Sequence, residues 1–144
     1  MISPQRAWAD DPNTSVFRET FDKNTTFQGG RDGNFNGGSG QKIAFDNEGW
    51  TGNNTSKIYG ANQCLRFGTD KDNGVLTTPE ISLGGASYAL LTFSATGWGD
   101  ASKNTLSISV NDGFTIVSGD NNIAELENAV WNDYSVLQSR PRPY

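Results

Sequence analysis

The 144-residue sequence has no histidine and only one cysteine, Cys64. Without histidine there is no serine-protease-like triad, no histidine general base and no histidine metal ligand. A single cysteine excludes an intramolecular disulfide and a cysteine-rich zinc site. Catalysis would have to use lysine or a pair of carboxylates, and no distinctive acidic pair of the glycosidase kind stands out. We therefore expect a protein that is not an enzyme.

Positive charge and long apolar runs are also scarce. The sequence has 11 Lys and Arg against 16 Asp and Glu, which gives a formal net charge of −5. A nucleic-acid partner would need a basic face, so we expect none. No segment approaches the roughly 18 consecutive apolar residues that a membrane-spanning helix needs, so membrane insertion is not expected either.

What the sequence does contain is 17 glycines, many Asn, Ser and Thr residues, and short alternating segments. We count seven to nine short candidate strands separated by turn signals. This pattern predicts an all-β chain folded as an antiparallel β-sandwich. The glycine-rich region 22–42 is expected to be a long loop. The candidate strands are 15–21, 42–47, 63–68, 75–83, 87–97, 104–113, 114–119 and 131–138.

Two segments carry the clearest strand signals. Residues 87–97 are apolar on both faces for part of their length, which is typical of a buried strand. In 104–113, Leu106, Ile108 and Val110 alternate with polar residues, so one face should point inward. The Asp-Gly turn that follows predicts a hairpin into 114–119.

The expected domain organisation is simple. Residues 1–14 read as a disordered leader, 15–138 as the β-sandwich domain, and 139–144 as a tail. Pro141 and Pro143 prevent regular strand pairing in that tail. Either it is a true tail, or the sandwich lacks a strand there and leaves an edge open to association.

The succession FRETFD, W, LRFG, GVLTTPEISL, LLTFSATGW, LSISVNDG and WNDY resembles the jelly-roll domains called cleaved-adhesin or choice-of-anchor J domains. These are relatives in shape of MAM domains and carbohydrate-binding modules. The likeness covers about residues 15–138, and its most specific part is the L-x-T/S-P-x-I/L-x-L step in LTTPEISL. It implies a non-catalytic module of a secreted or cell-surface bacterial protein, with a structural calcium ion. The family's closing strands and Asp-Asp-Val/Ile-like motif are missing after Leu137.

Glu19 is the first candidate metal ligand, because it lies between two phenylalanines on the expected inner face of its strand. A buried carboxylate costs several kcal/mol unless it is paired or bound to a metal. The resemblance implies that Glu19 and Asp22 hold calcium, and Asp46 could add a third carboxylate. The alternative is an edge strand in which Glu19 reaches solvent or pairs with Arg18 or Arg66.

Trp98 is the first candidate ligand-binding residue, since it stands between two glycines at a strand exit. Sugar rings stack on tryptophan, and Asp100 and Asn104 could hydrogen-bond to sugar hydroxyls. Trp50 lies in a similar context, while the alternative for Trp98 is that it covers the open end of the sandwich. We expect carbohydrate as the ligand, and the alternative is an adhesive or spacer domain that contacts a surface protein.

Overall fold

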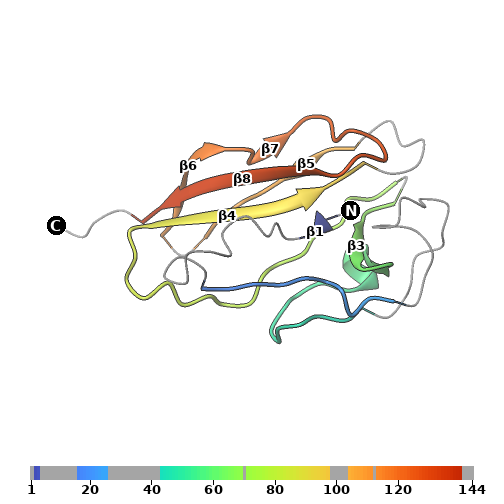
Figure 1. Cartoon of the computed structure of the whole chain (residues 1–144), viewed down its shortest axis with the longest axis horizontal. Helices are drawn as coiled ribbons and strands as arrows, with labels where there is room; N and C mark the ends of the chain where they lie inside the picture. The colour runs from blue at the N-terminus through green and yellow to red at the C-terminus, as the bar shows by residue number, and fades with distance from the viewer. Residues whose placement is uncertain are drawn as a thin grey trace.

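The computed structural model describes residues 2–3, 16–25, 43–69, 71–97, 104–111 and 113–140, with only the backbone of residues 2 and 3. Within these ranges the chain is all-β with two antiparallel sheets, as the sequence predicts, and its one helical turn is a 3-10 turn at Asn54–Ser56. The larger sheet has the order β2 (Ile58–Ala61), β3 (Cys64–Phe67), β1 (Ile2–Ser3), β4 (Tyr88–Ala95), β8 (Asn132–Ser139) and β6 (Thr115–Gly119). The smaller sheet pairs β5 (Leu106–Ser107) with β7 (Asn122–Ile123) (Figure 1).

The β4–β8 pair forms the main axis of the molecule (Figure 1). The two strands are matched over all eight residues of each, and they confirm the strands predicted in 87–97 and 131–138. Alternate side chains of β4, among them Leu91 and Phe93, point to one side and pack with Val136 of β8. This core cluster is covered by apolar residues from β5, β6 and β7.

The 104–113 segment has the predicted alternation but not the predicted partner. Leu106 and Ile108 are half-buried against the core cluster, and the residues between them are exposed. The turn also forms, since the Phe114 N–H donates to the Asn111 carbonyl over 3.3 Å. However, β5 pairs with β7 and β6 pairs with β8, so the hairpin prediction is wrong. The chain crosses from one sheet to the other at this turn, which lets both arms cover the same core.

The predictions of strands at 15–21 and 42–47 are also wrong, although these segments do lie side by side. Side chains replace the backbone ladder between them: the buried Asn24 amide donates to the Ala44 carbonyl and accepts from the Ala44 N–H, both over 2.8 Å. Phe21 has a φ of 59°, a left-handed conformation that ends any extended run. The alternation in 15–21 therefore correctly predicts that Glu19 and Phe21 are buried, although the segment does not form a strand.

Two further differences concern the middle of the chain. β2 forms between two of the predicted strands, in a segment for which we predicted no strand, and it pairs with the predicted strand β3. The segment 75–83 was expected to be a broken strand, and it holds only an isolated bridge between Thr77 and Thr51. Its other described residues are not in a strand.

The ends of the chain join the larger sheet. Residues 2 and 3, expected within a disordered leader, form β1 and pair with both β3 and β4. The rest of the expected leader, 4–14, lies outside the described residues, as do 141–144 of the expected tail. Ser139 closes β8, so the ordered strand extends one residue past the predicted boundary.

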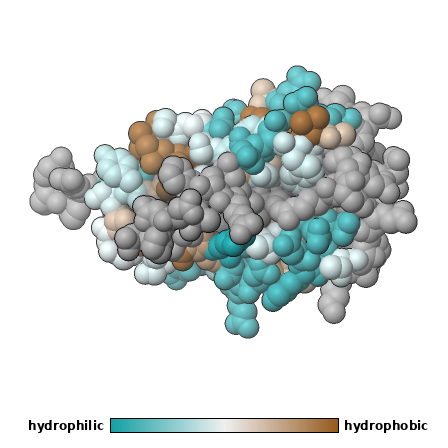
Figure 2. Space-filling model, viewed as in Figure 1, coloured by the Kyte–Doolittle hydropathy of each residue, from teal (hydrophilic) through white to brown (hydrophobic). Residues whose placement is uncertain are grey.

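The visible surface is mainly hydrophilic where it is described, with small separate apolar patches (Figure 2). Among the described residues, no helix has the length and apolarity that crossing a membrane would require.

Candidate functional site

Glu19 lies at the centre of a cage of N–H donors. Its side chain is 3% exposed. One carboxylate oxygen, Oε1, accepts the indole N–H of Trp50 over 3.0 Å and the backbone N–H of Asn47 over 3.1 Å. The other, Oε2, accepts the backbone N–H groups of Asp46 over 2.8 Å and Phe21 over 3.3 Å. The buried charge is thus compensated by hydrogen bonds that join the 16–25 segment to the 43–50 segment.

This donor arrangement does not fit the calcium ion that the family resemblance implies. Calcium needs about six to eight oxygen ligands, whereas both Glu19 oxygens already face the positive ends of N–H dipoles. The carboxylate of Asp46 turns instead to Thr20, whose hydroxyl and backbone N–H both donate to it. Asp22 is exposed. Within the described ranges, no three acidic or sulfur-bearing residues gather in a way that could hold a metal.

Asp46 has a shifted acidity. Its pKa lies below the ordinary value of 3.8, chiefly because the Thr20 hydroxyl donates a hydrogen bond to the carboxylate. The backbone N–H of Thr20 acts in the same direction, and partial burial opposes them. Asp46 therefore works as an ionised acceptor that fastens its own loop to Thr20.

Trp50 belongs to an aromatic cluster. Its ring stacks on Phe45 with centroids 5.2 Å apart and an interplanar angle of 9°. Phe21 and Phe17 contact it at 5.7 and 6.0 Å between ring centroids. Because its N–H is used by Glu19 as well, Trp50 is held as a packing residue, and this geometry does not favour the sugar-binding role we predicted for it.

Of the other predicted ligand-binding residues, only Asn104 lies in the described part of the chain. Trp98 and Asp100 lie outside the described residues, so their roles stay predictions. Asn104 is half-buried, its carbonyl accepts the N–H of Leu126 over 2.6 Å, and its amide lies close against Gly97. A side chain at Gly97 would collide with that amide, so the tight approach depends on the glycine.

The outer face of the β4–β8 pair offers an exposed surface that we did not predict. Tyr88 is 62% exposed and Leu90 is 47% exposed. Residues directly opposite one another in an antiparallel pair share a face, so Tyr88 lies beside Ser139 and Leu90 beside Leu137. The alternation in YALLTFSA carries the signal for this face, because inward Leu91 and Phe93 require Tyr88 and Leu90 to point outward.

Further along the same face the side chains become polar. Thr92 lies opposite Ser135, and Ser94 lies opposite Asp133. The Ser94 hydroxyl donates to the Asp133 carboxylate over 2.5 Å. The face therefore passes from an aromatic and aliphatic end to an end of hydroxyls and one carboxylate.

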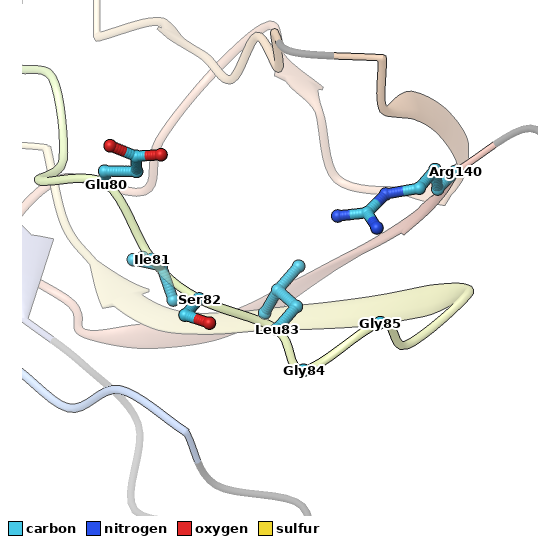
Figure 3. Close-up of a pocket in the computed structure, with 7 residues that line it drawn as sticks. All are labelled: Glu80, Ile81, Ser82, Leu83, Gly84, Gly85 and Arg140. Atoms are coloured by element: carbon cyan, nitrogen blue, oxygen red, sulfur yellow. The ribbon is translucent and has the colours of Figure 1, made fainter.

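A hollow of about 440 Å³ lies at the same end of the strand pair as Tyr88. Its lining comes from the loop that leads into β4 and from the residue after β8: Glu80, Ile81, Ser82, Leu83, Gly84, Gly85 and Arg140 (Figure 3). The backbone N–H of Arg140 donates to the Ser87 carbonyl over 2.9 Å, which fixes the hollow beside the start of β4. Its volume lies in the range usual for small-ligand sites.

No protein-family model matches this sequence, and no curated protein or solved structure shows significant similarity to it. The described surfaces that bear on function are the outer β4–β8 face and the hollow at one end of the strand pair.

Proposed function

We propose that this chain is a non-catalytic, carbohydrate-binding β-sandwich of the jelly-roll kind, a cleaved-adhesin or choice-of-anchor J type module of a secreted or cell-surface bacterial protein. Two antiparallel sheets whose apolar residues meet in one core cluster support the sandwich architecture. The sequence resemblance supports the family and the setting.

The observation that carries carbohydrate binding is the exposed Tyr88 on the β4–β8 pair, whose same face carries a row of hydroxyl groups. The C–H face of a sugar ring packs on an aromatic ring, while its hydroxyls need polar partners at the rim. Thr92 and Ser94 stand on the same strand face and supply such partners, with Asp133 as an acceptor. A face of this length suits an extended oligosaccharide better than a single small molecule.

Affinity electrophoresis against a panel of soluble polysaccharides tests the proposal. We expect one or more polysaccharides to retard the wild-type protein, and Tyr88→Ala to weaken that interaction about tenfold or more through the lost stacking contact. Tyr88→Phe keeps the ring and should retain most of the binding. Val75→Ala, at a similarly exposed apolar residue elsewhere, is the matched control. Full binding by folded Tyr88→Ala would contradict the assignment of this face.

A second candidate function, adhesion through protein contacts, is favoured by the position of β6. This strand lies at the edge of the larger sheet, and Val117 on it is 52% exposed. An edge strand offers unpaired backbone groups to a second strand, although the irregular register between Ile116 and Ser118 disturbs that template. Sedimentation of the wild type and of Val117→Lys discriminates: an assembly that the lysine disperses, with no retardation by any polysaccharide, would favour adhesion.

A further inference from the structure

Arg140 stands out because a contact with an aromatic ring positions its charge. Its guanidinium lies over the Phe114 ring, 4.9 Å from the ring centroid. Within the described part of the chain, no carboxylate forms an ion pair with it. The cation–π contact limits the freedom of the side chain but leaves the N–H donors at the edge of the guanidinium available.

The hollow beside Arg140 is polar at opposite ends. Figure 3 shows the guanidinium reaching in from one end, while Glu80 lies at the other end of the lining loop. Leu83 provides an apolar wall between them, and Ser82 contributes a hydroxyl. Gly84 and Gly85 adopt positive φ angles and have open space where a side chain would stand, so the loop leaves the entrance clear.

We propose that this hollow binds the carboxylate of an acidic sugar residue, a uronic acid, within the glycan that the chain recognises. The inference rests on the proposed carbohydrate-binding function and names the class of sugar. A planar guanidinium presents parallel N–H groups that match the two oxygens of a carboxylate. Glu80, at the far end, suits the hydroxyls of a sugar, which can donate to it, better than a second negative charge.

The hollow and Tyr88 lie at the same end of the strand pair but on different sides of it. Arg140 follows Ser139, the residue opposite Tyr88, so strand alternation turns the guanidinium away from the Tyr88 face and toward Phe114. A glycan that contacts both would pass over the end of the strand pair. Because the chain carries a net charge of −5, a polyanion gains no general attraction. Recognition of an acidic glycan therefore depends on local cations, and Arg140 is the cation that lines this hollow.

The test compares polygalacturonate with its fully methyl-esterified form, which has the same backbone without the negative charges. We expect wild-type protein to bind the acid form at least about tenfold more tightly, since a charged hydrogen bond is lost on esterification. Arg140→Gln should remove this preference, while Arg140→Lys keeps the charge without the planar fork and should retain part of it. Arg18→Gln, at another exposed arginine, is the control with the same change in charge.

The outcomes separate this inference from the proposed function. Equal binding of the acid and ester forms by wild type, or an undiminished acid preference in folded Arg140→Gln, overturns the uronic-acid site and leaves carbohydrate binding standing. If no polysaccharide retards the protein, both the uronic-acid site and the proposed carbohydrate-binding function are contradicted. Arginine-dependent binding of an acidic peptide but of no glycan also overturns the inference, and it assigns the hollow to a protein partner.

Discussion

At the scale of single residues, Glu19 shows what the sequence can and cannot reveal. Its burial could be predicted from the phenylalanines on either side. Its partners could not, because they are mainly backbone N–H groups of residues more than 25 positions away, and any residue type supplies such a donor. Trp50 and Asn47 also donate to Glu19 through their side chains, and we interpreted Trp50 as part of a sugar site.

Glu19→Gln should destabilise the fold by about 3 kcal/mol, because the new amide group turns donors toward donors and leaves buried N–H groups unpaired. Urea denaturation measures this change, with exposed Asp22→Asn as the control. Calcium should shift the melting temperatures of wild type and Glu19→Gln equally. A calcium-induced rise of about 5–10 °C in wild type alone would identify Glu19 as a metal ligand after all.

The lowered pKa of Asp46 leads to a prediction about the stability of the fold at acidic pH. Its folded-state pKa is lowered, so its contribution to stability is present above the unfolded value, near 3.8, and is lost as the pH falls through the folded value. Thr20→Val removes the hydroxyl that is the main cause of the shift. Denaturation measured from pH 5 to pH 2 should show a shallower loss of stability in this variant. Identical acid profiles for the two proteins would show that the Thr20 hydroxyl does not hold Asp46.

At the scale of elements, the sequence predicts strands well where alternation coincides with a backbone ladder. β3, β4 and β8 meet this condition, since their apolar side chains repeat every second residue and their neighbours are turns. Segments 15–21 and 42–47 have the same alternation, but Asn24 and Glu19 join them through side chains. The partner of β5 could not be predicted either, because a turn motif fixes a local reversal and not which sheet receives each arm.

The core cluster beneath β4 and β8 should hold the two sheets together. Val136 of β8 is 0% exposed, so Val136→Ala should cost about 2 kcal/mol by leaving a cavity between the sheets. Val117→Ala on β6 makes the same chemical change at an exposed residue and should alter stability by less than about 0.5 kcal/mol. Similar unfolding free energies for both variants would show that the packing beneath β8 does not dominate stability.

At the scale of the whole molecule, function depends on which surface remains available once the core has formed. The aromatic residues near Glu19 pack on one another, and half-buried Trp50 stacks on Phe45 while its indole N–H donates to Glu19. Tyr88 and Leu90 stay outside because β4 turns its other face to the core. The sequence contained this information, yet the apolar character of both faces of β4 led us to expect burial on both sides.

The most direct test of the account is a titration of isotopically labelled protein with an oligosaccharide from the best-binding polysaccharide, followed by backbone amide NMR. The account predicts that the largest shift changes map to Tyr88, Leu90 and Thr92 of β4 and to the end of β8 that faces them. Changes confined to the neighbourhood of Trp50 or to β6, with β4 unaffected, would contradict it.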